Sequence, residues 1–162
     1  LADAAAPSLI LAYGIGRIGC QLAGDGDYGI PTDLPWAMGY PNGYVSTLAA
    51  KNMELVEYFK HIFPGREIPL DIKVHPAPVY ETVIAVICFA VLWKLRKKPY
   101  VAGWLFGLYL IFAGIERLSV EFIRINPLYG GLSQAQWISI LMIILGSWMM
   151  WKRKQTSKFK TD

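Results

Sequence analysis

Apolar and polar residues along this chain are grouped in long blocks. Four apolar segments stand out, over residues 4–18, 78–93, 100–122 and 136–151. A membrane-spanning helix needs about 20 mainly apolar residues, so the first segment is short for a span unless it extends upstream or is broken. Aromatic residues lie near the segment ends, as in the aromatic belts of membrane proteins. The pattern predicts an all-α polytopic membrane helical bundle with about four transmembrane helices.

The polar stretch between the first two segments predicts a small external lobe. Its apolar residues recur at helical spacing over residues 46–62, which predicts an amphipathic helix capped by Ser46 or Thr47 and ended by Pro64-Gly65. The expected divisions of the chain are transmembrane helices over 1–24, 76–98, 99–124 and 136–151, external parts over 25–75 and 125–135, and a cytoplasmic tail over 152–162.

Composition supports a membrane location. The chain has 162 residues, of which 54% are hydrophobic and 17% charged, against about 25% charged in a typical soluble domain. Its mean hydropathy is +0.35. Basic clusters over 94–98 and 152–160 follow the second and fourth apolar segments directly. The positive-inside rule places both clusters, and with them the C-terminus, in the cytoplasm. Nothing else in the chain resembles a nucleic-acid module, so we expect no nucleic-acid partner.

This orientation brings three polar motifs to the outer side together. The second and fourth segments run inward, so the first and third run outward. The lobe over 25–75 carries seven acidic and four basic residues. It therefore lacks the lysine and arginine excess of a cytoplasmic loop.

The first motif is the glycine-rich stretch over 16–29, which contains Arg17. Glycines allow a backbone to approach a ligand closely, so the motif fits an anion-binding turn. It also fits a glycine-rich packing surface with a snorkelling arginine. A calcium loop is excluded, because Gly29 and Trp36 occupy ligand positions. The two cysteines, Cys20 and Cys88, show no zinc spacing, and we expect no disulfide, metal or cofactor.

The second motif, residues 75–81, leads into the second apolar segment. Glu81 would lie about one turn inside the span, where an unpaired carboxylate is unfavourable, so we expect it to meet an arginine. His75 fits an interfacial residue with a structural hydrogen bond better than it fits a general base. The general-base role stays open as the alternative.

The third motif places Arg117, Glu121 and Arg124 at i, i+4 and i+7, on one stripe of a helix. Two cations to one anion leave a net positive charge, and phosphate oxygens match arginine forks. An anion site is therefore predicted, with a structural salt-bridge stripe as the alternative. Glu116 is a further potential partner for an arginine.

Together the three motifs resemble those of the bacterial prolipoprotein diacylglyceryl transferases. The resemblance rests on Gly16-Arg-Ile-Gly with Gly24-Asp and Gly29, on His75-Pro with Tyr80-Glu81, and on Arg117 with Val120-Glu-Phe-Ile-Arg124 and Pro127. It implies an inner-membrane enzyme of about seven spans, of which this chain would be the C-terminal four. The implied reaction transfers the diacylglyceryl group of phosphatidylglycerol to the lipobox cysteine of a prolipoprotein signal peptide.

The resemblance also implies site residues. Arg17 and Arg117 would bind the lipid phosphate, with Glu121 and Arg124 completing that site. Asp25 stands where the family usually has Glu, and Gly29 is the closing glycine of the signature. The catalytic set expected from the resemblance is Arg17, Arg117 and Glu121. The expected phosphatidylglycerol-binding set is Arg17, Cys20, Asp25, Gly29, His75, Tyr80, Glu81, Arg117 and Arg124.

Three departures from the family pattern affect this expectation. Cys20-Gln21 replaces the usual Asn-Phe, and the stretch from Asp25 to Gly29 is one residue longer than the common form. The family's essential histidine lies upstream of this chain, and His75 is no substitute. Two alternatives follow: a non-catalytic homologue that binds anionic phospholipid, or a fragment of an anion or lipid transporter.

Overall fold

The computed structural model describes residues 1–98, 100–125, 128–129 and 131–158. Five helices occupy most of this part: α1 (Ala2–Ala23), α2 (Met53–Ile62), α3 (Ala77–Leu95), α4 (Trp104–Glu121) and α5 (Gln134–Lys158). The strands β1 (Leu128–Tyr129) and β2 (Leu132–Ser133) form a short antiparallel hairpin. The helical prediction is therefore confirmed for the described residues. Pro127 of the third motif and residues 159–162 of the expected tail lie outside them.

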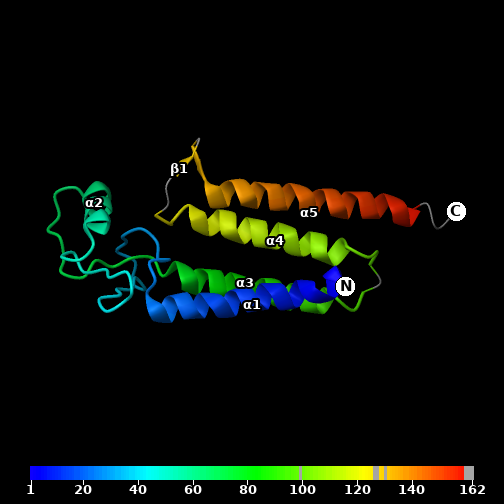
Figure 1. Ribbon diagram of the computed structural model, residues 1–162, viewed down its shortest axis with the longest axis horizontal. Coiled ribbons are helices and arrows are strands. Elements are labelled where there is room, and N and C mark those ends of the chain that lie inside the picture. Colours follow the sequence, from blue (N-terminus) through cyan, green and yellow to red (C-terminus); the bar gives the residue numbers. More distant parts are fainter. Residues whose placement is uncertain (99, 126–127, 130, 159–162) are drawn as a thin grey trace.

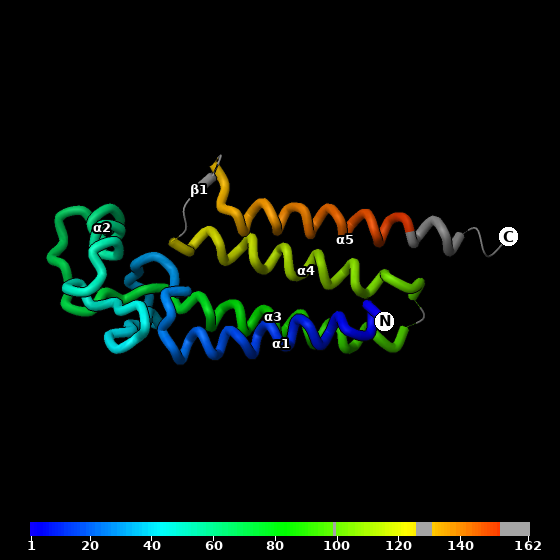
Figure 2. Tube along the Cα trace, in the orientation of Figure 1, coloured from blue at the N-terminus to red at the C-terminus, as the bar shows by residue number. Residues whose placement is uncertain are grey.

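The four long helices lie side by side along one axis (Figure 1). Helix α1 packs along α3, α4 packs along α5, and α4 also contacts α1 and α3. The tube in Figure 2 shows the start of α1 at one end of this bundle and α2 beyond the other. Of the described helices, only α3 is long and apolar enough to cross a membrane, by length and composition. Four spans and their orientation stay predictions.

Small residues let neighbouring helices approach closely. A Cβ atom built on Gly146 of α5 would lie 2.5 Å from the carbonyl oxygen of Gly107 in α4, and one on Gly14 of α1 would lie 2.9 Å from Cβ of Ala85 in α3. Around Ala85, an apolar core also contains Ile10, Leu92 and Leu105. Close backbone approach at small residues is a common way for helices to pack in membranes.

Helix α4 is shorter at both ends than the transmembrane helix predicted over 99–124. It begins at Trp104, because Gly103 has a φ of 90° and the backbone N–H groups of Gly103 and Phe106 donate to the carboxylate of Asp3. A carboxylate satisfies the free N–H groups of a helix N-terminus. The helix ends at Glu121, which leaves Arg124 outside it.

The last helix is longer than the predicted span over 136–151. It starts at Gln134 and continues to Lys158. Its beginning is fixed by a reciprocal pair of hydrogen bonds: Ser133 N–H donates to Gln136 Oε1 at 2.9 Å, and Gln136 N–H donates to Ser133 Oγ at 3.2 Å. This is a capping box, in which two otherwise unpaired backbone donors are satisfied.

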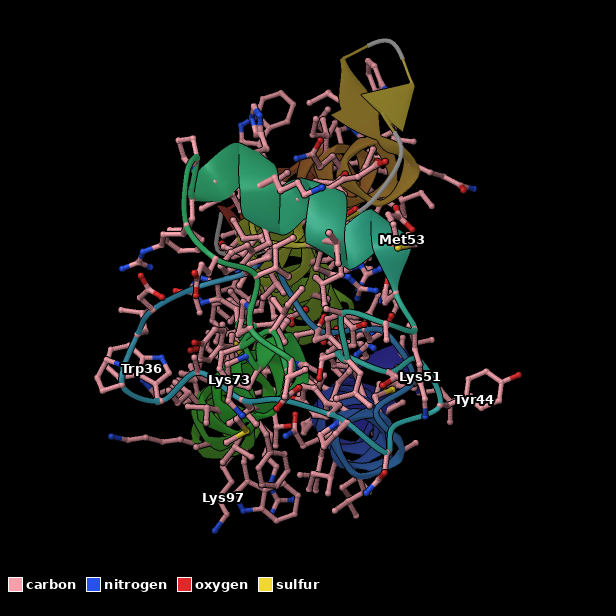
Figure 3. All side chains as sticks on the ribbon, turned by 90° about the vertical axis from the view of Figure 1, so that its left-hand side faces the viewer. Trp36, Tyr44, Lys51, Met53, Lys73 and Lys97 are labelled. Atoms are coloured by element: carbon pink, nitrogen blue, oxygen red, sulfur yellow. The ribbon has the colours of Figure 1, made fainter. Side chains whose placement is uncertain are left out.

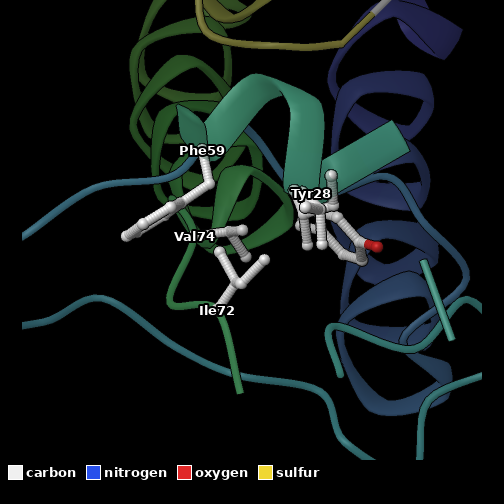
Figure 4. Packing of buried hydrophobic residues seen from close by; sticks show 6 residues of the cluster. Tyr28, Phe59, Ile72 and Val74 are labelled. Carbon is white, nitrogen blue, oxygen red and sulfur yellow. The ribbon is translucent and has the colours of Figure 1, made fainter. Parts of the chain in front are cut away.

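The lobe over 25–75 has its own apolar core. Figure 4 shows side chains of this core packed beneath α2; its buried members are Tyr28, Leu55, Val56, Phe59, Ile72 and Val74. Isolated β-bridges such as Met38 with Val74 and Leu48 with Asp71 connect the irregular segments. The lobe therefore has a defined fold held largely by apolar burial.

The predicted start of the lobe helix at residue 46 is wrong. Thr47 is fully buried, its hydroxyl donates to Asp71, and its carbonyl accepts from Ile72 N–H. The segment therefore pairs with the chain around residue 71 instead of forming helix. Helix α2 begins at Met53, with the Asn52 side chain accepting a hydrogen bond from Leu55 N–H at 3.0 Å. Such an N-cap stabilises the first turn.

The lobe also presents large apolar side chains outward. Figure 3 looks onto the lobe, where the labelled Trp36, Tyr44 and Met53 project from it. All three are exposed.

Candidate functional site

A buried carboxylate lies where three helices meet at the lobe end of the bundle. Glu81, in the first turns of α3, is 0% exposed. Its carboxylate oxygens lie 3.0 Å from Arg17 Nε of α1, 3.2 Å from Arg117 Nη1 of α4, and 3.8 Å from Arg124 Nη1. The prediction that Glu81 meets an arginine is confirmed. The site is an arginine–carboxylate cluster: Arg17, Asp27, Glu81, Arg117, Glu121 and Arg124.

Asp27 is the second carboxylate of this cluster. It forms ion pairs with both Arg17 and Arg124, so it connects α1 to the segment after α4. Burial raises the pKa of Asp27, but Arg124 and Arg17 outweigh that effect and hold the pKa below its usual range. The sequence analysis assigned Asp27 no part in the arginine site, so this role was missed. The sequence did contain a signal for it, because Arg17 and Arg124 together need more than one carboxylate as counter-charge.

Asp25, expected from the family signature, lies beside the cluster without an ion pair in the described part of the chain. It is exposed, and its Oδ1 accepts a hydrogen bond from Asp27 N–H at 3.2 Å. It therefore shapes the turn that presents Asp27. A lipid-binding role for Asp25 stays a prediction.

Tyr13 lies one helical turn before Arg17, so both side chains share a face of α1. The Tyr13 hydroxyl lies 3.0 Å from Glu81 Oε1 and 3.3 Å from Glu116 Oε1. The Arg17 guanidinium lies 5.1 Å from the centroid of the Tyr13 ring. Glu116 thus contacts a tyrosine where sequence reasoning considered an arginine. Tyr13 was missed, although its i, i+4 spacing from Arg17 was readable.

The single helical stripe of the third motif is only partly right. Arg117 Nη2 and Glu121 Oε2 are 4.0 Å apart on α4, as the i, i+4 spacing predicts. Arg124 follows the end of α4 and reaches Asp27 and Glu81 from a turn. Helix α4 stops before Arg124, the i+7 position, because the chain turns there toward the lobe. Arg124 then forms a β-bridge with Gly29.

Gly29 connects the three motifs through its backbone. Its N–H donates to the carbonyl of His75 at 2.8 Å, and the next residue, Ile30, donates to the carbonyl of Ile123 at 2.7 Å. A Cβ atom at position 29 would lie 2.7 Å from that Ile123 oxygen and 2.9 Å from Cβ of His75. Only glycine permits this approach. The motifs therefore meet at one end of the bundle, as the sequence predicted.

His75 and Tyr80 form a separate group at the edge of the site. His75 Nδ1 lies 3.3 Å from the Tyr80 hydroxyl, which accepts a hydrogen bond from Trp36 Nε1 at 2.7 Å. Burial lowers the pKa of His75, which favours the neutral imidazole. This arrangement fits the structural reading of His75. A direct lipid contact by His75 or Tyr80 stays a prediction.

Cys20 lies beside Arg17 on the side of Asp27, with its Sγ 3.6 Å from the same Arg17 Nη1 that pairs with Asp27. The possible ligand atoms of Cys20, Asp25 and Asp27 lie within 4.8 Å of one another. Two arginines already neutralise Asp27, so the local field is unfavourable for a cation. The group therefore gives no support to a metal site.

The charges of the cluster balance. Its three cations, Arg17, Arg117 and Arg124, face three carboxylates, Asp27, Glu81 and Glu121. The count of two cations to one anion applies to the third motif alone, and the assembled site differs because folding adds Arg17 of α1, Glu81 of α3 and Asp27 of the lobe.

A cavity of about 220 Å³ opens beside the cluster. It is lined by residues of α1, α4 and α5: Ile10, Tyr13, Tyr109, Ala113, Glu116, Arg117 and Met142. Arg117 is thus shared between the cluster and the cavity. It is also the most exposed of the three arginines, at 28% of its side chain against 13% for Arg17 and 9% for Arg124. An apolar cavity with one accessible arginine at its wall suits a molecule that has both an apolar and an anionic part.

A family model for prolipoprotein diacylglyceryl transferase matches residues 1–152. The chain belongs to the prolipoprotein diacylglyceryl transferase family. The match covers all three motifs of the site, and it confirms the resemblance seen in the sequence.

Curated relatives of the family carry the name phosphatidylglycerol–prolipoprotein diacylglyceryl transferase. The chain is 35% identical to that of Clostridium tetani over 147 residues, 89% of this chain and 49% of the relative. It is 30% identical to that of Pseudomonas putida over 168 aligned positions, 98% of this chain and 54% of the relative. It is 31% identical to that of Bordetella parapertussis over 153 residues, 91% of this chain and 48% of the relative. The chain thus spans about half the length of the transferases it matches.

Proposed function

We propose that the full-length protein containing this chain transfers the diacylglyceryl group of phosphatidylglycerol to the lipobox cysteine of prolipoproteins. Family membership and the names of the relatives support this reaction class. The observation that carries the proposal is Arg117, which belongs to a buried arginine cluster and also lines an apolar cavity. A phospholipid needs both parts of such a site, because its acyl chains are apolar and its phosphate is anionic.

The chemistry gives the arginines a role in the transition state. The cysteine sulfur attacks the carbon of the diacylglyceryl group that is bonded to a phosphate oxygen. A C–S bond forms, and the bond between that carbon and the phosphate oxygen breaks. The thiol proton passes to a base, and glycerol 1-phosphate leaves. Negative charge grows on the phosphate oxygens as the C–O bond breaks, so a guanidinium held in place beside them stabilises the transition state. Of the three arginines, Arg117 is the one among the residues that line the cavity.

The carboxylates would hold these arginines ready before substrate binds. Arg17 and Arg124 share Asp27, and both of them and Arg117 contact Glu81. A guanidinium fixed by ion pairs loses little freedom when the phosphate arrives, which is the basis of electrostatic preorganisation. Glu81, Asp27 and Glu121 are therefore positioning residues in this proposal.

The proposal includes a location. The protein would be a multi-pass protein of the bacterial inner membrane with its C-terminus in the cytoplasm, as the basic clusters after the second and fourth segments predict. The lobe and the arginine cluster would then face the outer side of that membrane, where a lipobox peptide could reach them.

The experiment uses the full-length protein in detergent with phosphatidylglycerol and a lipobox peptide. It follows the release of glycerol phosphate and the mass gain of the peptide. We expect transfer by the parent and a loss of about 100-fold or more in Arg117→Ala, the usual effect of removing a donor to developing negative charge. Glu67→Gln, an exposed change in the lobe, serves as the matched control.

Three outcomes separate the readings. Transfer by the parent that is lost in Arg117→Ala supports the proposal. Transfer that persists in Arg117→Ala refutes the role of that arginine. If the full-length parent binds phosphatidylglycerol and transfers nothing, the protein is a lipid-binding homologue and the proposed reaction is wrong.

A further inference from the structure

One buried carboxyl group is not used by the mechanism above. Glu116 of α4 is 4% exposed and lines the cavity next to Arg117. Glu116 Oε1 lies 3.3 Å from the Tyr13 hydroxyl, within hydrogen-bond distance. Within the part of the chain that the structure describes, no lysine, arginine or histidine forms an ion pair with Glu116. An ionised carboxylate buried without a counter-charge is strongly disfavoured, whereas the protonated acid is tolerated.

The hydrogen bonds around Tyr13 point the same way. The Tyr13 hydroxyl has one proton but lies within hydrogen-bond distance of two carboxyl groups, at 3.0 Å from Glu81 and 3.3 Å from Glu116. Three arginines contact Glu81, so Glu81 is ionised and can only accept. Tyr13 therefore donates to Glu81. The contact between Tyr13 and Glu116 becomes a full hydrogen bond if Glu116 carries a proton and donates it to the Tyr13 oxygen.

The charge of the site supports this assignment. Three arginines balance Asp27, Glu81 and Glu121, so an ionised Glu116 would leave an excess negative charge beside Arg117. That excess would repel the phosphate of an anionic lipid, because like charges close together in a poorly solvated site interact strongly. A protonated Glu116 leaves the cluster neutral and Arg117 attractive to phosphate.

We propose that Glu116 is a protonated carboxylic acid that donates a hydrogen bond to Tyr13, which donates in turn to Glu81, and that its neutral form is required for an anionic phospholipid to bind beside Arg117. This inference rests on the proposed function for the identity of the lipid. Glu116 acts through Tyr13 and through its charge, so it is a positioning residue.

The proposal predicts a dependence of lipid binding on pH. When alkaline pH ionises Glu116, the Michaelis constant for phosphatidylglycerol should rise. The titratable and charged groups that face Glu116 are Tyr13 and Arg17 of α1, Glu81 and Cys88 of α3, and Arg117 and Tyr109 of α4. Helix α5 contributes Met142 to the shared cavity, and a methionine side chain does not titrate. Variants are therefore needed to assign any alkaline effect.

The first test is infrared spectroscopy of the full-length protein in detergent at neutral pH. A protonated carboxylic acid has a carbonyl stretching band that a carboxylate lacks. We expect the difference between the parent and Glu116→Gln to contain this band, and the difference between the parent and Glu67→Gln to lack it, because Glu67 is exposed. Absence of the band from the Glu116 difference would show an ionised Glu116 and overturn the proposal.

The second test measures transfer from phosphatidylglycerol as a function of pH. Glu116→Ala removes the donor to Tyr13 and should raise the Michaelis constant about tenfold, with kcat changed less, since one hydrogen bond is worth about that factor. Glu116→Gln supplies a neutral donor, so it should rescue most of the loss at neutral pH and remove the alkaline rise.

The outcomes of the second test are equally decisive. An alkaline rise that persists in Glu116→Gln would assign the titration to another group and refute the positioning role. If Glu116→Ala does not fold, the pH profile of Glu116→Gln still decides. The infrared band needs no turnover, so a protein that transfers nothing would refute the proposed function and leave the protonation of Glu116 to be judged by the band.

Discussion

The lobe core and the arginine–carboxylate cluster lie close together but are held by opposite kinds of interaction. Phe59, Ile72 and Val74 of the lobe bury apolar surface, which stabilises any fold that achieves it. Glu81 and its arginines bury charge, and the desolvation of charges offsets much of their attraction. The lobe core is explained by stability alone. The cluster is better explained by what its arginines can bind.

The two regions also differ in how far a single change spreads. Each residue of the lobe core contributes separately to a shared apolar volume. Asp27 and Glu81 each contact two or more arginines from different elements, as Asp27 does with Arg17 and Arg124. Removing Asp27 or Glu81 therefore takes one ion-pair partner from several buried cations at once, and the loss is greater than that of one ion pair.

The largest effect is expected from Glu81→Leu. The variant leaves Arg17 and Arg117 without the carboxylate that both contact, and breaking a buried pair in this way costs about 4 kcal/mol. Thermal unfolding of the full-length protein in detergent measures the free energy, and transfer activity should be lost as well. An unfolding temperature equal to that of the parent would show that the cluster does not need its central carboxylate.

Phe59→Ala breaks the other side of the comparison. Phe59 lies on the buried face of α2 and is 6% exposed, and truncating a buried phenylalanine costs about 3 kcal/mol. Local unfolding of the lobe is measured by hydrogen exchange of residues around α2. Met53→Ala on the same helix, at an exposed position, is the matched control and should change stability by less than about 0.5 kcal/mol. Similar losses in both variants would contradict the described core.

Gly29→Ala tests the connection between the two regions. The new Cβ would meet the Ile123 carbonyl oxygen at 2.7 Å, so the lobe must shift from the end of α4 at a cost of about 2 kcal/mol. Gly16→Ala is the control, because no atom lies within 4 Å of its Cβ and alanine favours helix by about 0.5–1 kcal/mol. Unfolding curves should move in opposite directions. The same direction for both would refute the close approach at Gly29.

The smallest effect concerns acid pH. The pKa of Asp27 is lowered in the folded protein, so its contribution to stability is complete above the unfolded pKa of about 3.9 and is lost as pH falls through the folded value. Stability should therefore be insensitive to Asp27 between neutral pH and about pH 5 and decline below about pH 4. Asp27→Asn should flatten this acid decline in a pH series of unfolding curves. An unchanged decline would assign it to other carboxyl groups.

Much of the fold could be predicted from the chain alone. The long apolar segments correspond to α1, α3, α4 and α5, since apolar runs of that length form helices whatever their neighbours are. Boundaries were less accurate. The lobe helix starts at Met53 because Thr47 pairs with Asp71, a contact between residues far apart in the sequence. Local periodicity contains no information about such a contact.

The sequence by itself determined the family, the helical character and the arginines of the candidate site, because motif residues and apolar runs are local properties. Only the tertiary structure decided the charge balance: it added Glu81 and Asp27 to the arginines, placed Arg124 beyond the end of α4, and set Tyr13 between two carboxyl groups. Electrostatic energy depends on distance and burial, and both are fixed only when separate elements pack together.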